Sequence, residues 1–525
     1  MKSIFTVILL SIILFSSCEN NPPAAKDKTG SQYTEQHRPS FHFSPESKWM
    51  NDPNGMVYYD GEYHLFYQYY PDSTVWGPMH WGHAVSKNLL TWEHLPIALF
   101  PDENGWIFSG SAVVDWNNTS GLGKNGKPPL VAIFTSHSSP GEKAGRNDFQ
   151  TQSIAYSLDN GRKWTKYPGN PVLKSPGIRD FRDPKVSWHE ASQQWIMTLA
   201  VQDHISFYAS PDLKTWSHQS DFGKASGAHG GVWECPDLFQ LQVPGSKETK
   251  WVLLVSINPG GPNGGSATQY FVGSFDGKTF RSDNSPETTL WMDYGRDNYA
   301  GVTWSDIPKA DGRRLLMGWM SNWQYATVVP TEKWRSATTI PRELTLKNTS
   351  AGLRLISSPV VELEKLRGKS SKIDAQKVAG IVDLSAKLGF PAAQMEAILE
   401  LELPNDSSAD LGIEVSNSKG ERYRVGYNAA TKQFYSDRTQ AGKTAFSNVF
   451  AEKIHVAPRL ASGNIVRLHI YFDRASAELF GDDGATVMTD ILFPNEDYTQ
   501  VKVYAENGTA QLKSGVFYVV KSIWE

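Results

Sequence analysis

Short apolar segments, interrupted by glycine, proline, asparagine and aspartate, dominate the chain between residues 41 and 343. Aromatic and β-branched residues fill these segments, for example at residues 55–59, 63–68 and 251–255. Almost none of them shows the three- to four-residue spacing of a helix, and their length and composition are typical of β-strands. The turn at residues 60–62, Asp-Gly-Glu, predicts a hairpin between the first two segments. This part of the chain is therefore expected to be all-β.

A loose internal repeat runs through the same region. Residues 84–92, 155–164 and 208–216 each read as a strand, a Ser-x-Asp or Ser-x-Asn turn and then an aromatic residue. Residues 272–280 form a degenerate fourth copy. Recurrence at this coarse interval predicts the blades of a β-propeller. Coincidental hairpins in a β-sandwich are the alternative, which the repeated turn disfavours.

The pattern changes near residue 366. A polar connector at 367–376 precedes segments that largely alternate between apolar and polar positions, at 397–403, 411–415 and 466–472. Such alternation is typical of strands covered on one face. We therefore expect residues 367–525 to form a β-sandwich. It contains no carboxylate motif, so a supporting role is expected, with sugar binding as the alternative.

The N-terminus is typical of an export signal. Lys2 precedes an apolar run at residues 4–15 that is too short to span a membrane comfortably, and small residues lead directly to Cys18. This arrangement resembles a bacterial lipoprotein processing site, which predicts a signal peptide at 1–18 and lipidation of Cys18. An ordinary secretory signal is the alternative. Residues 19–39 are expected to be a flexible tether.

Composition narrows the possible partners. The net charge is only −4, with both signs interspersed, which argues against nucleic acid or a charged membrane surface as partner. Membrane contact is expected only through the lipid anchor. The chain has two cysteines, so lipidation of Cys18 would leave Cys235 without a disulfide partner. We expect Cys235 to be a buried neighbour of Glu234 rather than a reactive nucleophile. The sequence does not specify an oligomeric state.

Three carboxylates lie in short motifs that carry proline or aromatic residues. Asp52 lies in Trp-Met-Asn-Asp-Pro-Asn-Gly (49–55), Asp183 in Phe-Arg-Asp-Pro, and Glu234 in Gly-Gly-Val-Trp-Glu-Cys-Pro-Asp. The Asp-Pro and Asn-Gly pairs predict that Asp52 lies where an extended segment gives way to a turn. Two carboxyl groups of differing acidity are the minimum for hydrolysing a glycosidic bond. In a propeller, the innermost strands could bring all three carboxylates to one pocket.

At these motifs the sequence resembles glycoside hydrolase family 32, the fructan hydrolases and invertases. Further matching stretches occur at residues 76–83, 108–111 and 317–323. The resemblance implies a five-bladed propeller at 40–366 followed by a β-sandwich. It also implies that no metal or other cofactor is needed.

The resemblance further implies the roles of the carboxylates in a retaining double displacement on a β-fructofuranosyl unit. Asp52 would be the nucleophile, Glu234 the acid/base and Asp183 the transition-state stabiliser. Arg182 would steer Asp183 or contact the sugar, with a simple salt bridge as the alternative. The matching positions that would bind fructose are Asn51, Gln68, Trp76, Ser109, Arg182 and Trp319. Trp81 and Trp323 are interpreted as packing residues, and His80 and His83 as ordinary hydrogen-bonded histidines rather than a metal pair.

The expected substrate is levan or inulin, with sucrose as a further possibility, and the segments at 76–80 and 108–111 look most like those of exo-acting enzymes. An endo-levanase at the cell surface and a fructosyltransferase remain alternatives. So does an inverting five-bladed enzyme acting on arabinan or xylan, which the intact segment at 49–55 disfavours. The non-enzyme alternative is a lipid-anchored fructan-binding protein. It would be expected to have lost a carboxylate, and all three are present.

Overall fold

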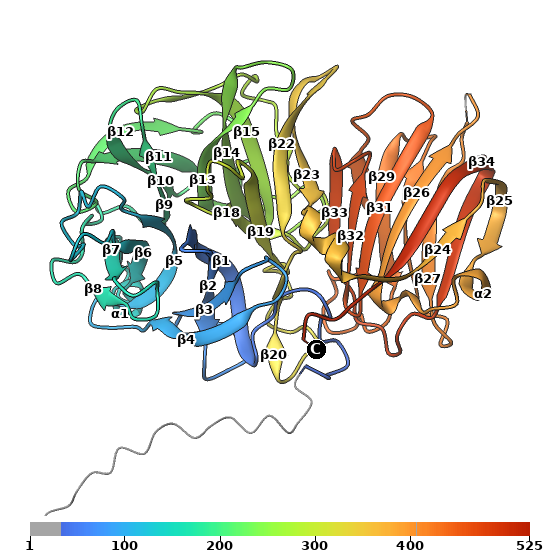
Figure 1. Ribbon diagram of the computed structural model, residues 1–525, viewed down its shortest axis with the longest axis horizontal. Coiled ribbons are helices and arrows are strands. Elements are labelled where there is room, and N and C mark those ends of the chain that lie inside the picture. Colours follow the sequence, from blue (N-terminus) through green and yellow to red (C-terminus); the bar gives the residue numbers. More distant parts are fainter. Residues whose placement is uncertain (1–32, 406, 525) are drawn as a thin grey trace, which may run out of the picture.

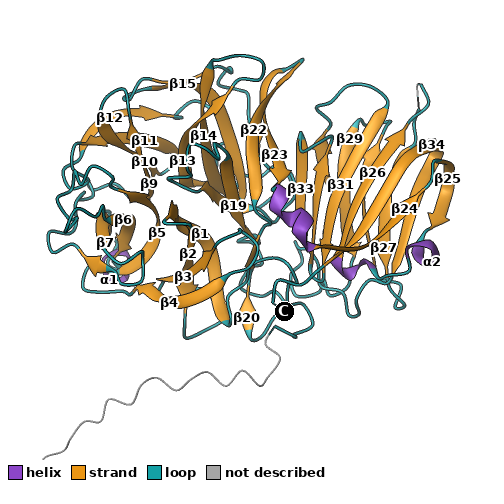
Figure 2. Ribbon diagram, viewed as in Figure 1, coloured by secondary structure: helices purple, strands orange, loops and turns teal. Residues whose placement is uncertain are grey.

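The computed structural model describes residues 33–405 and 407–524, which form two all-β domains lying side by side (Figure 1). Strands make up nearly all of the regular structure, as Figure 2 shows. Within this part of the chain, no helix is long and apolar enough to cross a bilayer. The predicted signal peptide, Cys18 and residues 19–32 of the predicted tether lie outside the described residues.

The N-terminal domain is a five-bladed β-propeller, which confirms the predicted fold class. Blade 1 contains β1 (Lys48–Tyr59), β2 (Glu62–Tyr70), β3 (His80–Ser86) and β4 (Glu93–Leu99). Blade 2 contains β5 (Trp106–Val114), β6 (Leu130–His137), β7 (Gln150–Ser157) and β8 (Thr165–Lys166), with helix α1 (Ser139–Lys143) between β6 and β7. Blade 3 contains β9 (Phe181–His189), β10 (Gln194–Val201), β11 (His204–Ser210) and β12 (Ser217–Phe222).

The last two blades carry small additional strands. Blade 4 contains β13 (Val232–Gln242), β14 (Thr249–Asn258), β15 (Ala267–Phe275), β16 (Phe280–Ser282) and β17 (Leu290–Trp291). Blade 5 contains β18 (Tyr299–Thr303), β19 (Arg314–Met320), β21 (Ala337–Thr338), β22 (Arg342–Thr349) and β23 (Gly352–Pro359). The short strand β20 (Trp334–Arg335) pairs in parallel with β1 of blade 1, so a segment between β19 and β21 of blade 5 helps to close the ring.

The internal repeat marks the outer hairpin of each of the first four blades. Its copies connect β3 to β4, β7 to β8, β11 to β12 and β15 to β16. The Asn or Asp of each turn organises the backbone. Asp212 Oδ1, for example, accepts hydrogen bonds from the backbone N–H groups of Lys214 (2.9 Å) and Thr215 (2.7 Å). Side chains that bond to the backbone in this way favour tight turns, which explains why the motif recurs.

The innermost strands of the five blades surround one axis. Strand β1 contacts β5, β5 contacts β9, β9 contacts β13, β13 contacts β18, and β18 contacts β1 again. Strands β5, β9, β13 and β18 each form an edge of their own sheet, and β1 is flanked there only by the short strand β20 (Figure 1). Residues that are distant in sequence can therefore meet where these strands begin.

The C-terminal domain is a β-sandwich built from one folded sheet that follows the 3₁₀ helix η1 (Val361–Leu366). Its first strands are β24 (Arg367–Ile373), β25 (Gln376–Asp383), β26 (Met395–Glu402) and β27 (Asp410–Ser416), with α2 (Ser385–Leu388) and η2 (Ala392–Gln394) between β25 and β26. The remaining strands are β28 (Arg422–Asn428), β29 (Gln433–Gln440), β30 (His455–Pro458), β31 (Ile465–Asp473), β32 (Ser476–Gly481), β33 (Thr486–Ile491) and β34 (Gln500–Val520).

The long strand β34 joins the two layers of this sandwich. Its residues 500–506 pair with β27, whereas residues 511–519 pair with β26. Apolar side chains from both layers, including Leu399, Ile413 and Val503, form one continuous core cluster.

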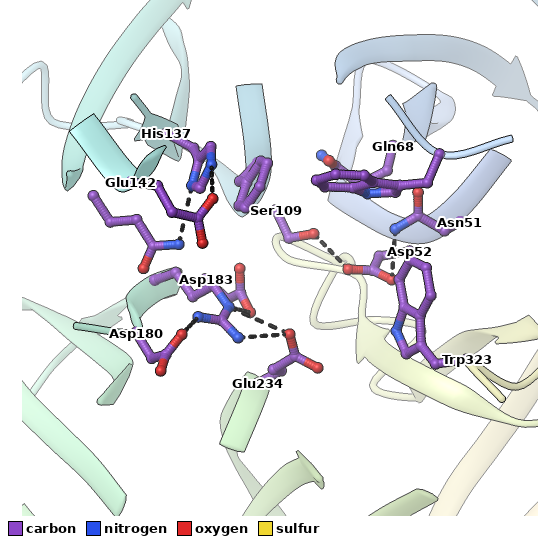
Figure 3. Close-up of a pocket in the computed structure, with 14 residues that line it drawn as sticks. Asn51, Asp52, Gln68, Ser109, His137, Glu142, Asp180, Asp183, Glu234 and Trp323 are labelled. Carbon is purple, nitrogen blue, oxygen red and sulfur yellow. Dashed lines mark hydrogen bonds and ion pairs between the residues drawn. The ribbon is translucent and has the colours of Figure 1, made fainter. Parts of the chain in front are cut away.

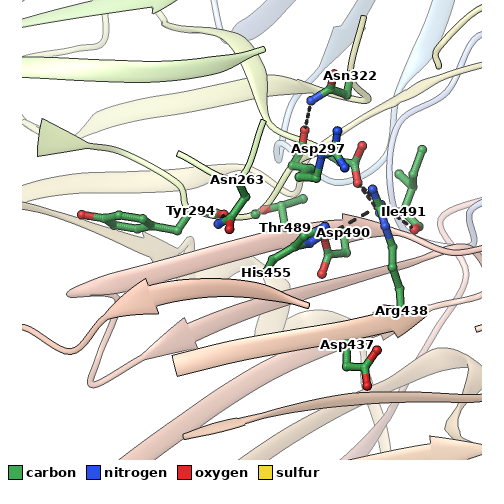
Figure 4. A network of polar contacts seen from close by, with 12 residues as sticks. Asn263, Tyr294, Asp297, Asn322, Asp437, Arg438, His455, Thr489, Asp490 and Ile491 are labelled. Carbon is green, nitrogen blue, oxygen red and sulfur yellow. Dashed lines mark hydrogen bonds and ion pairs between the residues drawn. The ribbon is translucent and has the colours of Figure 1, made fainter. Parts of the chain in front are cut away.

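Buried ion pairs hold the two domains together (Figure 4). Arg438 on β29 is fully buried, and its Nη1 lies 2.5 Å from Oδ2 of the propeller residue Asp297. The same carboxylate oxygen accepts the backbone N–H of Ile491 at 2.9 Å. A second buried arginine, Arg342 of blade 5, pairs with Glu478 on β32. Because removing one member of such a pair leaves an uncompensated charge, these contacts favour a fixed arrangement of the domains.

Residues 33–39 belong to this folded body. Tyr33 stacks on Trp524 with ring centroids 3.9 Å apart. Arg38 is buried and donates a 2.7 Å hydrogen bond to the carbonyl oxygen of Pro45. The tether predicted to extend to residue 39 therefore does not include these residues.

Candidate active site

The three motif carboxylates all lie at bulges in innermost strands. Between Met50 and Pro53, β1 advances by three residues while the paired strand β2 advances by two, so β1 contains one extra residue. The same irregularity occurs on β9 between Arg182 and Lys185, and on β13 between Glu234 and Asp237. A bulge redirects side chains and bends the strand locally. Asp52 was predicted to lie at a turn, but it lies inside β1, and the bulge supplies the change of direction.

Proline explains why these bulges recur. Pro53, Pro184 and Pro236 all fall within them. Proline has no backbone N–H, so it is tolerated at bulges and on edge strands, where no ladder hydrogen bond is lost. At two of the bulges the preceding residue adopts a left-handed conformation, with φ of 64° at Asp183 and 44° at Cys235.

The bulges face a pocket of about 280 Å³ (Figure 3). Eight of the residues predicted from the sequence line it: Asn51, Asp52, Gln68, Trp76, Ser109, Arg182, Asp183 and Glu234. The other lining residues are Phe108, His137, Glu142, Gln150, Asp180 and Trp323. Five of the lining residues carry carboxylates and one carries a guanidinium. The pocket therefore suits a neutral ligand on which positive charge develops, and it disfavours an anion.

Asp52 is held by three donors. Ser109 Oγ donates to Oδ2 at 2.7 Å, and Asn51 Nδ2 donates to Oδ1 at 3.0 Å. The Cys235 thiol lies 3.5 Å from Oδ2. Burial and the nearby Glu234 charge raise the pKa of Asp52, and these three contacts oppose the rise. The carboxylate is thus fixed in direction, and its three donors offset part of the cost of burying its charge.

Asp183 and Asp52 both contact Cys235. The backbone N–H of Cys235 donates to Asp183 Oδ2 at 3.1 Å, and its Sγ lies 3.7 Å from the same oxygen. Burial raises the pKa of Asp183 to about 7, with Arg182 opposing and the two other carboxylates reinforcing the shift. Cys235 was expected to be a buried neighbour of Glu234; it is buried, and its thiol contacts Asp52 and Asp183. Burial and these carboxylates raise its pKa well above the ordinary value, so the thiol is protonated.

Glu234 is held on both oxygens. Arg182 Nη2 donates to Oε1 at 2.9 Å, and the Tyr299 hydroxyl donates to Oε2. Arg182 also donates from Nη1 to Asp180 Oδ1 at 2.6 Å, whereas its Nε is 3.9 Å from Asp183. Arg182 was expected to steer Asp183 or contact sugar, but its short contacts are to Glu234 and Asp180. Tyr299 carried no sequence signal because it lies in an ordinary strand.

The other predicted pocket residues differ in whether their polar atoms already have hydrogen-bond partners within the protein. Asn51 Oδ1 accepts from Trp49 Nε1 at 2.7 Å, so that oxygen already has a partner. Gln68 is buried and donates from Nε2 to the carbonyl oxygen of Ile107 at 3.0 Å. Trp76, by contrast, is 37% exposed at the rim of the pocket. It can therefore offer an apolar face to a ligand.

Trp319 and Trp323 exchange the roles expected of them. Trp319 on β19 is fully buried in a core cluster, does not line the pocket, and packs behind Trp323 with ring centroids 4.8 Å apart. Trp323, which was interpreted as a packing residue, lines the pocket. Trp319 pairs with Tyr299 and Thr338 inside the sheet, whereas Trp323 follows the end of β19, where the chain turns toward the pocket.

The two histidines near Trp81 do not form a pair. His83 Nε2 lies 3.0 Å from His64 Nδ1, and His80 Nδ1 bonds the carbonyl oxygen of Pro78 at 2.9 Å. Across residues 33–405 and 407–524, no group of three His, Cys, Asp or Glu side chains is arranged to hold a metal ion.

The pocket residues missed by sequence reasoning lie mostly on blade 2. Glu142 belongs to α1, which begins after Ser138 in a Ser-Ser-Pro-Gly-Glu run. Serine before proline is a recognised signal for the start of a helix, and it could have revealed this insertion. The signal would not have shown that the helix borders the pocket.

Comparison with known proteins decides the family. The model of the glycosyl hydrolases family 32 N-terminal domain matches residues 42–359, and that of the family 32 C-terminal domain matches residues 362–519. The chain belongs to glycoside hydrolase family 32. It is therefore a retaining fructan or β-fructofuranoside hydrolase.

Relatives in family 32 cover nearly the whole chain. A levanase from Bacillus subtilis is 49% identical over 98% of this chain and 75% of its own length. An extracellular exo-inulinase from Aspergillus awamori is 38% identical over 94% of this chain and 96% of its own length.

Solved structures of family 32 agree in fold. The crystal structure of the Aspergillus awamori exo-inulinase has a TM-score of 0.86 at 37% identity, and the match covers 94% of this chain and all of that one. A fructofuranosidase from Schwanniomyces occidentalis, solved with fructosylnystose, has a TM-score of 0.84 at 33% identity and covers 94% and 99% of the two chains.

Proposed function

We propose that this family 32 enzyme is exo-acting and removes terminal fructose from levan and inulin. The observation that carries the proposal is the meeting of Asp52, Asp183 and Glu234 in one small pocket. Its volume of about 280 Å³ lies just below the roughly 300–1,000 Å³ that is typical of ligand pockets. A confined site of this size suits a chain end better than the middle of a polymer. The similarity to a levanase and to exo-inulinases supports the same substrate class.

In the proposed reaction, Asp52 attacks the anomeric carbon while Glu234 protonates the leaving oxygen. A covalent fructosyl–Asp52 ester forms as the glycosidic bond breaks. Glu234, now deprotonated, takes a proton from water, which attacks the same carbon and releases fructose with retained configuration and free Asp52. Ser109 and Asn51 direct the Asp52 carboxylate. Arg182 and Tyr299 direct Glu234.

Asp183 is assigned to stabilising the transition state. It is buried beside Asp52, with which it shares the Cys235 contact. A carboxylate at that position can bind ring hydroxyls and favour the positive charge of an oxocarbenium-like state. We assign the remaining contacts with fructose to Asn51, Gln68, Trp76 and Ser109, and add Trp323 as an apolar wall.

The test is incubation of protein lacking residues 1–18 with levan, inulin and sucrose, with products resolved by chromatography. Fructose alone at the first time points, absent for Glu234→Gln, is the expected result. A ladder of oligosaccharides would instead identify an endo-enzyme, and new oligosaccharides formed from concentrated sucrose would identify a transferase. Binding without any product would favour the fructan-binding protein.

We further propose that the protein is exported and anchored by a lipid on Cys18. The sequence pattern at residues 1–18 supports export, and the similar Aspergillus enzyme is described as extracellular. Expression in a bacterial host with labelled palmitate tests the anchor. Label is expected in the wild-type protein and absent in Cys18→Ala. Equal labelling, or none in either protein, would contradict the proposal.

A further inference from the structure

One side of the pocket is not used by the proposed chemistry. Figure 3 shows His137, Glu142 and Asp180 across the pocket from Asn51, Gln68 and Trp323, with Glu234 between the two groups. Arg182 bonds both Asp180 and Glu234. Since Glu234 is the proposed proton donor to the leaving oxygen, the group that departs must lie on its side of the pocket. The side chains near Arg182 therefore border the space that the leaving group enters.

Glu142 is fixed in this space from two directions. Its Oε2 lies 3.2 Å from His137 Nε2, and its Oε1 lies 3.1 Å from Arg179 Nη2. Ser138 supports the helix that carries it, accepting the backbone N–H of Gly141 at 3.2 Å. The Glu142 side chain nevertheless remains 38% exposed. A carboxylate that is oriented but accessible can accept hydrogen bonds from a ligand at little cost in ordering.

His137 presents a buried N–H on the same side. Phe181 N–H donates to Gln150 Oε1 at 2.9 Å, which orients the Gln150 amide so that its nitrogen faces His137 Nδ1 at 3.3 Å. An amide nitrogen only donates, so Nδ1 accepts and the ring proton is on Nε2. Burial lowers the pKa of His137 to about 4, which leaves the ring neutral at neutral pH. The ring also stacks on Phe108, with centroids 4.2 Å apart.

That N–H lacks a proper acceptor. His137 is 3% exposed, and among the described residues none accepts a well-aligned hydrogen bond from Nε2. The Glu142 oxygen, 3.2 Å away, attracts the N–H without completing a hydrogen bond to it. An unsatisfied buried donor is unfavourable unless a ligand or water completes it. Together with the acceptors Glu142 and Asp180, it matches a sugar hydroxyl, which both donates and accepts.

We propose that Glu142 and His137, with Asp180 beside them, form the subsite for the sugar on the leaving side of the scissile bond. This inference rests on the proposed function. The subsite favours a departing sugar, whether fructose or glucose, over a departing group without hydroxyls. Glu142 accepts from one hydroxyl of that sugar, and His137 Nε2 donates to another.

The experiment compares kcat/KM for levanbiose with that for methyl β-fructofuranoside, whose leaving group is methanol. Both substrates use the same fructosyl pocket, so their ratio isolates the leaving side. In Glu142→Gln, the ratio of levanbiose to methyl fructoside is expected to fall about tenfold, because a hydrogen bond to a charged group is lost. Glu142→Asp, which keeps the charge, is expected to recover part of the loss. Glu287→Gln, an exposed change on blade 4, is the matched control.

An unchanged ratio in Glu142→Gln would overturn the inference. So would an equal loss on both substrates, because it would mean that Glu142 only supports the pocket. Wild-type protein that hydrolyses neither substrate, nor levan, inulin or sucrose, would instead refute the proposed function. The two failures are thus distinguishable.

Discussion

Arg182 Nη2 lies 2.9 Å from Glu234 Oε1, while Nη1 of the same guanidinium lies 2.6 Å from Asp180. One partly buried cation therefore joins the proposed acid/base to a carboxylate on the leaving side of the pocket. Arg182 acts through Glu234, so it is a positioning residue. Its planar fork is suited to bridging two carboxylates, which a lysine ammonium cannot reproduce.

Replacing this arginine by lysine tests that relationship. Arg182→Lys keeps the charge but loses the bridging geometry, so kcat on sucrose or levanbiose is expected to fall about 100-fold, or roughly 2.7 kcal/mol. Methyl fructoside should show the loss as well, since Glu234 must protonate methanol too. Arg146→Lys, in an exposed pair with Asp148, is the control. A loss confined to KM would mean that Arg182 mainly binds substrate.

The pH profile should respond to Ser109. Its hydroxyl stabilises charged Asp52, so Ser109→Ala removes a contact that lowers the pKa of Asp52. The nucleophile must be deprotonated, and a higher pKa therefore shifts the acidic limb of the kcat/KM profile to higher pH. Rates measured between pH 3 and 8 would show the shift. Ser206→Ala, which removes a similar contact to Asp221 on blade 3, should leave the limb in place.

Cys235 should be inert in the folded protein. Its thiol is buried, and its pKa is raised by burial and by the carboxylates of Asp183 and Asp52. Since the thiolate is the reactive form, iodoacetamide at pH 7.5 should add nothing to native protein lacking residues 1–18. After denaturation one adduct should form. Intact mass spectrometry distinguishes the two states, and rapid labelling of active enzyme would contradict the predicted protonated thiol.

The domain interface should be sensitive to Arg438. Arg438→Ala leaves the buried charge of Asp297 uncompensated, so the free energy of unfolding is expected to fall by about 3–5 kcal/mol. Denaturant unfolding followed by tryptophan fluorescence would measure this change. Arg281→Ala removes an exposed pair with Asp276, for which a change of less than about 1 kcal/mol is expected. Similar losses of unfolding free energy for the two variants would show that the buried pair contributes little to stability.

The fold was largely readable from the sequence because turn chemistry repeats. The Ser-x-Asp and Ser-x-Asn turns marked the outer hairpins of four blades, and the Asp60-Gly61 turn correctly predicted the β1–β2 hairpin. The motifs also led to the pocket, since eight of the nine predicted side chains line it. Local sequence patterns were sufficient to predict a feature wherever a few neighbouring residues determine it, as in these turns.

The failures concern orientation and long-range contact. The sequence shows that Trp319 and Trp323 are close, but which one faces the core depends on how β19 ends. Asp-Pro predicted a turn at Asp52, because nothing local distinguishes a turn from a bulge on an innermost strand. Glu142 and Tyr299 carried no motif, and their importance arises only from packing against blades that are distant in sequence.

The strand that unites the two layers of the sandwich comes after all the others along the chain. Both β26 and β27 pair with β34, so neither layer has its shared partner until β34 has been synthesised. A protein that crosses a membrane unfolded must avoid folding too early. Under the proposed export, completion of this domain would wait until β34 has emerged, and the propeller would lack its buried partner Arg438 until β29 has emerged.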